Sequence, residues 1–289
     1  MRIKNIEERI IVMRKIPAIL SDIDGVLLRG KSCIPRSDRA AKFIRKPLRE
    51  LNPKLFGNSE HQIPFLAVTN GGGKLEFERA NDLNRALNLQ GHEKLSGNNV
   101  IMNFSPLRPI FKDFLDKVIL ISGVGDIERI VVDCGVHKFV TISEYCALYP
   151  SLVPISQRSI KTRAEILERV KQRLKISNHE FFEDPFKVDA IFFINDPIVW
   201  EESIQVTLDL LTTPDGRIAD KLPKEAPDTH IPIFAVNNDF LYSDSFRLPR
   251  LAFGPFTESL RHIYRLLHKK DLHINLFGKP EKSTFAYAG

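Results

Sequence analysis

The segment that decides the fold runs from residue 16 to residue 26 and reads IPAILSDIDGV. Residues 16–20 form an apolar run that is typical of a short buried strand, and Gly25 marks a turn just after it. Asp22 and Asp24 are two residues apart at the carboxyl end of this strand, so their side chains point the same way. In an open α/β sheet, ligands bind at that end. The pair predicts a hard-cation site for phosphate-ester chemistry, while two solvated aspartates are the simpler alternative.

The composition is that of an ordinary globular protein. The chain has 289 residues, 43% of them hydrophobic, which suits one large or two modest domains. No apolar run approaches the roughly 18 residues that a membrane span needs. The formal net charge of +6 suits an anionic substrate, although a solvated basic surface explains it more simply. There is no RNA-binding aromatic signature or zinc-finger spacing, so we expect no nucleic-acid partner.

Cysteine usage and the first residues bear on the compartment. Cys33, Cys134 and Cys146 show no paired metal spacing, which predicts free thiols in a reducing compartment. Residues 1–8 read MRIKNIEE, and their two acids are unusual for a mitochondrial presequence. The sequence alone therefore favours an intracellular protein without a clear import signal.

Strand-like and helix-like segments alternate along the chain. Apolar runs predict further strands at residues 63–68, 117–123, 136–142, 188–194, 231–236 and 273–277. Helices are predicted at residues 77–89, 160–176, 200–211 and 256–268. Residues 151–159 and 212–230 are rich in loop-forming residues. This alternation predicts an α/β fold with a mostly parallel, doubly wound sheet.

Two further turns carry reactive groups. Thr69, Asn70 and Gly71 open a glycine-rich turn after the second predicted strand, where a hydroxyl and backbone amides can approach an anion closely. Lys279 follows Gly278 directly after the last predicted strand. Taken singly, each is also typical of an ordinary solvated turn.

The order of these motifs resembles the haloacid dehalogenase-like (HAD) hydrolase superfamily, whose motifs run Asp-x-Asp, then Thr or Ser, then Lys, then a final acidic pair. The glycine-rich second motif and the long insertion before the lysine resemble subfamily IIA, which has a large α/β cap. A narrower resemblance, to the cat eye syndrome critical region hydrolase-like branch, rests on NGGG at 70–73, SPL at 105–107, DPIVW at 196–200, LPR at 248–250 and GKP at 278–280. The resemblance covers nearly the whole chain from about residue 17.

The resemblance implies a fold, a domain division and a cofactor. It implies a Rossmann-like HAD core with a parallel sheet, formed by residues 1–116 and 231–289, and an inserted α/β cap of the C2 type at residues 117–230. Caps of this kind close over the site and exclude water. It implies Mg²⁺ as cofactor, bound by a carboxylate oxygen of Asp22 and the main-chain carbonyl of Asp24.

Residue roles are implied in the same way. Asp22 would be the nucleophile that forms an aspartyl-phosphate, and Asp24 the general acid and base. The Thr69 hydroxyl and the amides near Asn70 and Gly71 would hold the phosphoryl oxygens. Lys279 would neutralise the charge on Asp22 and the phosphoryl group.

The expected function is a phosphatase that acts on a small phosphorylated metabolite. The alternative is a HAD-fold binding or scaffold protein with impaired catalysis, because the final acidic motif is absent. The family places that motif past one more strand after the lysine, so we expect a C-terminally truncated chain or, alternatively, a degenerate paralogue. Asp239 or Asp244 could replace the missing metal ligand. Eukaryotic members of the branch are often mitochondrial, which leaves mitochondrion and cytoplasm as the compartments; the substrate and the oligomeric state stay open.

Overall fold

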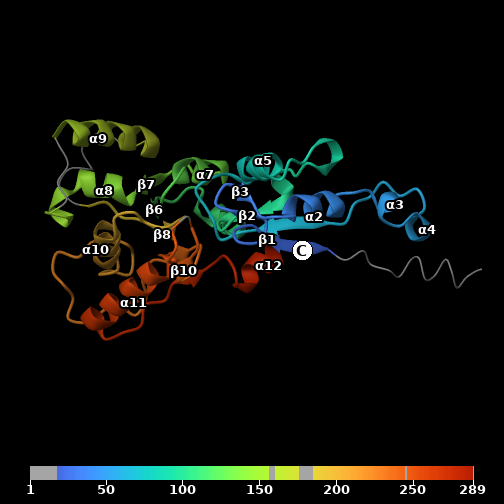
Figure 1. The fold of residues 1–289 in the computed structure, drawn as a ribbon. Coiled ribbons are helices and arrows are strands. Elements are labelled where there is room, and N and C mark those ends of the chain that lie inside the picture. Colours follow the sequence, from blue (N-terminus) through green and yellow to red (C-terminus); the bar gives the residue numbers. More distant parts are fainter. Residues whose placement is uncertain (1–17, 156–159, 176–184, 245, 289) are drawn as a thin grey trace, which may run out of the picture. The chain divides into compact units, whose positions relative to one another are not determined.

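The computed structural model describes residues 18–155, 160–175, 185–244 and 246–288, and these belong to two compact units (Figure 1). Unit 1 comprises residues 1–68 and 76–101, and unit 2 comprises residues 69–75 and 102–289. Residues 16 and 17, the predicted start of the first strand, lie outside the described residues. None of the described helices combines the length and the apolar character needed to cross a bilayer.

Unit 1 is built, within its described residues, on a three-stranded parallel sheet in the order β1-β4-β5. Asp22 at the end of β1 lies opposite Val68 at the end of β4. The strands are β1 (Ile19–Asp22), β4 (Phe65–Val68) and β5 (Val100–Ile101). The hairpin and helices of this unit are β2 (Leu28–Arg29), β3 (Ser32–Cys33), α2 (Ser37–Ile44), α3 (Leu48–Leu51), α4 (Pro53–Phe56), α5 (Glu76–Ala86), η1 (Gly91–Glu93) and η2 (Gly97–Asn99).

The core of unit 1 supports the carboxyl end of β1. Ile23, directly after that strand, is fully buried, as are Ala67 of β4 and Leu83 of α5. Burying an aliphatic side chain of the size of Ile or Leu contributes about 1.5–3 kcal/mol. Because Ile23 stands between Asp22 and Asp24, its burial fixes the backbone that carries both carboxylates.

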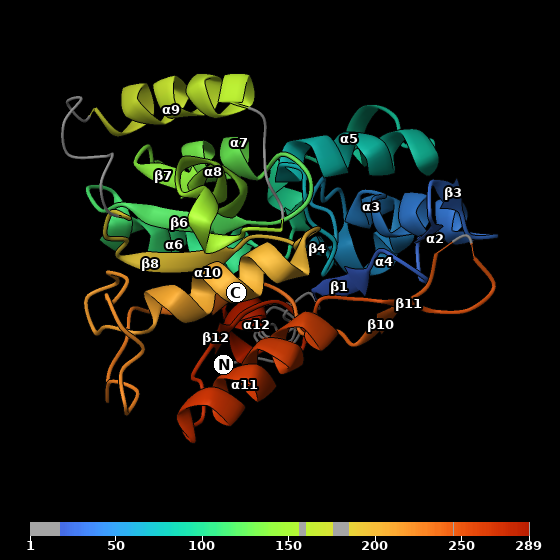
Figure 2. The same ribbon diagram turned by 90° about the vertical axis from the view of Figure 1, so that its left-hand side faces the viewer.

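Unit 2 is built on a five-stranded sheet in which the neighbouring strands are parallel, in the order β12-β9-β8-β6-β7 (Figure 2). The strands are β6 (Ile119–Ser122), β7 (Phe139–Thr141), β8 (Ala190–Phe193), β9 (Ile233–Ala235) and β12 (Asn275–Leu276), and a separate antiparallel ribbon contains β10 (Leu241–Tyr242) and β11 (Arg250–Leu251). The helices are η3 (Ser105–Leu107), α6 (Arg108–Phe111), η4 (Lys112–Phe114), α7 (Ile127–Asp133), α8 (Ile142–Leu148), η5 (Pro150–Leu152), α9 (Ile160–Leu174), α10 (Trp200–Leu210), α11 (Gly254–His268) and α12 (Lys282–Ala288).

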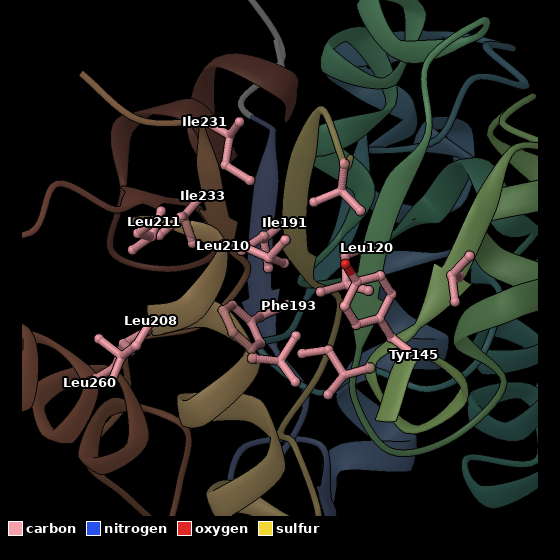
Figure 3. Packing of buried hydrophobic residues seen from close by; sticks show 14 of the residues in the cluster. Leu120, Tyr145, Ile191, Phe193, Leu208, Leu210, Leu211, Ile231, Ile233 and Leu260 are labelled. Atoms are coloured by element: carbon pink, nitrogen blue, oxygen red, sulfur yellow. The ribbon is translucent and has the colours of Figure 1, made fainter. Parts of the chain in front are cut away.

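Side chains alternate between the two faces of this sheet along each strand, and both faces are covered by helices. On one face, Leu120 and Phe193 pack with Tyr145 of α8 in a cluster that α9, α10 and α11 also enter (Figure 3). On the other face, the ring of Phe192 stacks on that of Phe111, with centroids 4.7 Å apart. Coverage of both faces explains why β6 and β8 read as continuous apolar runs in the sequence.

The predicted strand at residues 136–142 is wrong at its carboxyl end. Strand β7 stops at Thr141, and Ile142 is the first residue of α8. Thr141 Oγ1 accepts a hydrogen bond from the Glu144 amide (3.1 Å), and Glu144 Oε2 accepts one from the Thr141 amide (3.0 Å). This capping box begins the helix where hydrophobicity alone favoured a continued strand.

The two units divide the chain differently from the predicted core and cap. β9 and β12, which belong to residues 231–289, pair in one sheet with β6, β7 and β8 from residues 117–230. The difference arises because strand pairing is set by contacts between distant residues, which the pattern of apolar runs does not encode. Which residues act as a cap stays a prediction.

Candidate active site

Asp22 and Asp24 flank a tight turn at the end of β1 in unit 1. Asp22 Oδ1 accepts a hydrogen bond from the Ile23 amide (2.8 Å), which orients its carboxylate. The Gly25 amide donates to the Leu28 carbonyl (2.7 Å), and Gly25 has a φ of +92°, a conformation that favours glycine. The DIDG sequence therefore presents two carboxylates from a backbone held on both sides by hydrogen bonds.

Asp24 also has a cationic partner that the sequence did not reveal. Arg79 of α5 donates from Nη2 to Asp24 Oδ1 at 2.9 Å; the side chain of Arg79 is 17% exposed and that of Asp24 is 49% exposed. The two residues are 55 positions apart in the sequence. No sequence pattern distinguishes Arg79 from the other polar residues of α5 as a partner of Asp24. The ion pair gives the second carboxylate of the motif a fixed positive neighbour.

In unit 2, the Asn70 side chain connects the glycine-rich turn to Lys279 and to Asp239. Asn70 is only 9% exposed, and its Oδ1 accepts a hydrogen bond from the Lys279 amide (2.7 Å). Nδ2 donates to the Lys279 carbonyl (2.8 Å) and to Asp239 Oδ2 (2.9 Å). Thr69, 2% exposed, accepts the Gly71 amide on Oγ1 at 2.9 Å. The second and third motifs are thus linked by direct hydrogen bonds.

Gly278 permits this close approach before Lys279. Its φ is +87°, and a Cβ on it would lie 2.3 Å from the Val236 carbonyl oxygen and 2.9 Å from Asn70 Oδ1. No side chain fits at that distance from a backbone atom. The glycine of the Gly-Lys-Pro sequence is therefore required by the packing of the loop against the end of β9.

The glycine-rich turn after Thr69 packs against two asparagines of unit 2. A Cβ on Gly72 would lie 2.6 Å from Asn103 Nδ2 and 2.9 Å from Asn195 Oδ1. Asn103 is fully buried, and within the described residues neither of its amide atoms has a hydrogen-bond partner. Asn103 is not among the residues predicted from the sequence, because a lone asparagine close to the SPL segment carries no distinguishing pattern.

Two acidic residues stand at the ends of β8 and β9. Burial raises the pKa of the Asp196 carboxyl; a hydrogen bond with its own backbone amide opposes this, and the negative charge of Asp239 raises the pKa further. Asp239, a candidate metal ligand, accepts from Asn70, whereas Asp244 lies in an exposed stretch after β10. Within the described residues, no group of three or more His, Cys, Asp or Glu side chains is arranged to hold a metal ion.

The predicted site residues fall into two sets. Asp22 and Asp24 lie together in unit 1, and Thr69, Asn70, Gly71 and Lys279 lie together in unit 2. The chain links the sets directly, because Val68, the register partner of Asp22, is followed by Thr69.

Residues 19–137 match the family model described as haloacid dehalogenase-like hydrolase, a span that contains the Asp-x-Asp turn and the glycine-rich turn. This part of the chain belongs to the haloacid dehalogenase-like hydrolases. The predicted superfamily is thereby confirmed. The fold class is confirmed as an α/β fold with parallel sheets that matches a Rossmann-like core, and the inserted α/β cap stays a prediction.

The individual proteins that this chain resembles are distant from it in sequence. A mitochondrial hydrolase of Saccharomyces cerevisiae is 24% identical over 271 residues, which are 94% of this chain and 68% of the relative. A hypothetical protein from Pyrococcus horikoshii has a similar structure, with a TM-score of 0.55, 15% identity and coverage of 93% of this chain and 74% of that one. A glycerol phosphate phosphatase from Mycobacterium tuberculosis in complex with calcium has a TM-score of 0.50, 14% identity and coverage of 93% and 55%. Both structural likenesses concern the fold.

Proposed function

We propose that this HAD hydrolase is a Mg²⁺-dependent phosphatase that cleaves the phosphate ester of a small metabolite. The observation that carries the proposal is the parallel register of β1 and β4, in which Asp22 lies opposite Val68 and the chain continues directly into Thr69. A carboxylate nucleophile and a phosphate-binding turn on neighbouring strand ends suit phosphoryl transfer.

Asp22 is the nucleophile in this proposal. Its carboxylate oxygen bonds to phosphorus as the ester oxygen leaves, which gives an aspartyl-phosphate and an alkoxide that takes up a proton. Water then attacks the phosphorus, the bond to the Asp22 oxygen breaks, and inorganic phosphate leaves with the carboxylate restored. The hydrogen bond from the Ile23 amide holds the Asp22 carboxylate in one orientation for both steps.

Asp24 carries the proton between the two steps. It gives a proton to the leaving oxygen and then takes one from the attacking water, a role typically worth about 10²–10⁴-fold in rate. Arg79, 2.9 Å from Asp24 Oδ1, is a positioning residue that holds this carboxyl group in place.

The glycine-rich turn and the lysine bind the phosphoryl group. The Thr69 hydroxyl and the amides around Asn70 and Gly71 donate to its oxygens. Lys279 supplies a positive charge, and its backbone is held by the Asn70 side chain, whose Nδ2 donates to the Lys279 carbonyl and whose Oδ1 accepts from the Lys279 amide. Fixed placement of donors and charge is the main protein contribution to phosphoryl transfer.

The donor chemistry at the end of β1 fits a hard divalent cation. Carboxylate and carbonyl oxygens are the ligands that Mg²⁺ prefers, and Mg²⁺ is commonly held by one or two carboxylates together with substrate phosphate. Asp22 and the main-chain carbonyl of Asp24 are the residues that would hold it. When bound, such an ion neutralises charge on the phosphoryl oxygens. The related phosphatase crystallised with calcium supports the choice of a divalent metal.

The proposal is tested by hydrolysis of p-nitrophenyl phosphate with and without Mg²⁺, comparing the unaltered chain with Asp22→Asn. We expect turnover that requires Mg²⁺ and is abolished by the substitution. Undiminished turnover in Asp22→Asn would overturn the nucleophile assignment. Vanadate binding without any turnover by the unaltered chain would favour the non-catalytic alternative. We also propose a mitochondrial location, which the yeast relative's name supports and cell fractionation tests.

A further inference from the structure

Unit 2 contains a cleft of about 880 Å³ that the proposed phosphatase chemistry does not use. It lies at the carboxyl ends of β6 and β7 and includes residues from the loop between β8 and α10. None of the proposed catalytic or phosphate-binding residues lines it. A volume of this size is within the range of about 300–1,000 Å³ that is usual for small-molecule sites.

The cleft lies where the strand order of the sheet reverses. From β6 the chain passes to β7 on one side, and it returns to β8 on the other side of β6 before continuing to β9 and β12 (Figure 2). In open α/β sheets, such a switch point is the usual place for a ligand, because the loops on either side diverge and leave a crevice. The topology and the cleft point to the same place independently.

The floor of the cleft is polar and buried. Glu202 and Ser203 in the first turn of α10 are each 2% exposed, and Ser122 at the end of β6 is 8% exposed. The hydroxyl oxygens of Ser122 and Ser203 are 3.4 Å apart. A carboxylate has about four lone-pair sites, so Glu202 can accept bonds from a ligand as well as from the protein. This floor suits a ligand with two neighbouring hydroxyl groups.

The charges of the lining disfavour an anion. Arg173 is paired with Glu144 (2.7 Å) and with Glu128 (3.1 Å). Arg129 lies 3.6 Å from Asp126. Both arginines therefore have carboxylate partners, and Glu202 adds a buried carboxyl group to the lining. A neutral ligand that donates hydrogen bonds fits better than a phosphorylated one.

The walls are apolar enough for a flat ring. The cleft is lined by the buried side chains of Ile127, Phe139 and Ile142. Val199 also lines it and is 44% exposed. We propose that this cleft binds a nucleoside, with the base against these side chains and the vicinal hydroxyls of the ribose on Glu202 and the two serines. Acidic side chains at the switch points of nucleotide-binding sheets bind ribose hydroxyls in the same way.

The test is calorimetric titration of the full chain with adenosine and with 2′-deoxyadenosine, in buffer without Mg²⁺. We expect one adenosine per chain, and 2′-deoxyadenosine to bind roughly tenfold more weakly because it lacks one hydroxyl bond to a charged acceptor. Glu202→Gln should weaken the binding of adenosine by a similar factor. Glu201 is an exposed neighbour outside the cleft, so Glu201→Gln should leave adenosine binding unchanged.

A second variant keeps the test decisive if Glu202→Gln fails to fold. Val199→Trp fills the cleft from an exposed position and should abolish adenosine binding, while Ile155→Trp, 85% exposed and outside the cleft, should leave it unchanged. Asp22→Asn should also leave it unchanged, which separates this site from the proposed phosphatase function. Absence of adenosine binding at millimolar concentration, or binding that survives Val199→Trp, would overturn the proposal.

Discussion

Replacing Asn70 by alanine tests whether its side chain holds the second and third motifs together. The substitution removes three hydrogen bonds: one to Asp239 (2.9 Å) and two to the backbone of Lys279 (2.8 and 2.7 Å). A neutral hydrogen bond contributes about 0.5–1.5 kcal/mol, and one to a charged group about 1.5–3 kcal/mol. Because these three share one side chain they are not additive, and we expect Asn70→Ala to lower the free energy of unfolding by about 3 kcal/mol.

The assay is urea unfolding followed by tryptophan fluorescence. Trp200 is the single tryptophan of the chain, and its ring lies 5.7 Å from that of Phe256 in unit 2, so its emission reports on the unit that contains Asn70. Asn58→Ala, at an exposed asparagine, is the matched control and should be within about 0.5 kcal/mol of the unaltered chain. A loss below about 0.5 kcal/mol for Asn70→Ala would refute the argument that these bonds hold the loop.

Three further predictions concern unit 2. Gly278→Ala should lower the free energy of unfolding by about 2 kcal/mol or more, because Gly278 has a φ of +87° and the new Cβ would lie 2.3 Å from the Val236 carbonyl oxygen. An unchanged midpoint of urea unfolding would contradict this. Burial alone would raise the pKa of Glu144, but hydrogen bonds from Arg173, the Thr141 amide and Arg169 lower that pKa below the ordinary value of 4.5. The ionised Glu144 carboxylate should therefore stabilise the fold above pH 4.5, and this stabilisation should be lost as the pH falls through the lowered pKa. Thermal melts of Glu144→Gln should lack this loss of stability at acid pH. Lys279→Met should weaken vanadate inhibition about tenfold, and equal inhibition would exclude the lysine from phosphate binding.

The elements that could be predicted from the sequence are those whose burial leaves a local pattern. β8 lies between covered faces, so residues 190–194 read as one apolar run that is followed by turn residues. The Asp-x-Asp turn is equally local, because Gly25 and the buried Ile23 stand within the motif itself. In both cases the physical cause and the sequence signal involve the same few residues.

The features that could not be predicted depend on contacts between distant residues. The ion pair of Arg79 with Asp24 spans 55 positions, and the bonds of Asn70 to Lys279 span 209. The pairing of β12 with β9, which places both in the sheet of unit 2, is likewise non-local. The start of α8 was different, since its capping box from Thr141 to Glu144 is a readable signal that the apolar run around it obscured.

The central claim is that Asp22 carries the phosphoryl group during turnover. The most direct measurement is borohydride reduction of the chain during p-nitrophenyl phosphate hydrolysis at saturating Mg²⁺, followed by mass spectrometry of the peptide that contains residue 22. Reduction of an aspartyl-phosphate gives homoserine, so we predict homoserine at position 22 only when substrate and Mg²⁺ are both present. Turnover with an unmodified aspartate at that position, or homoserine at Asp24 instead, would contradict the account.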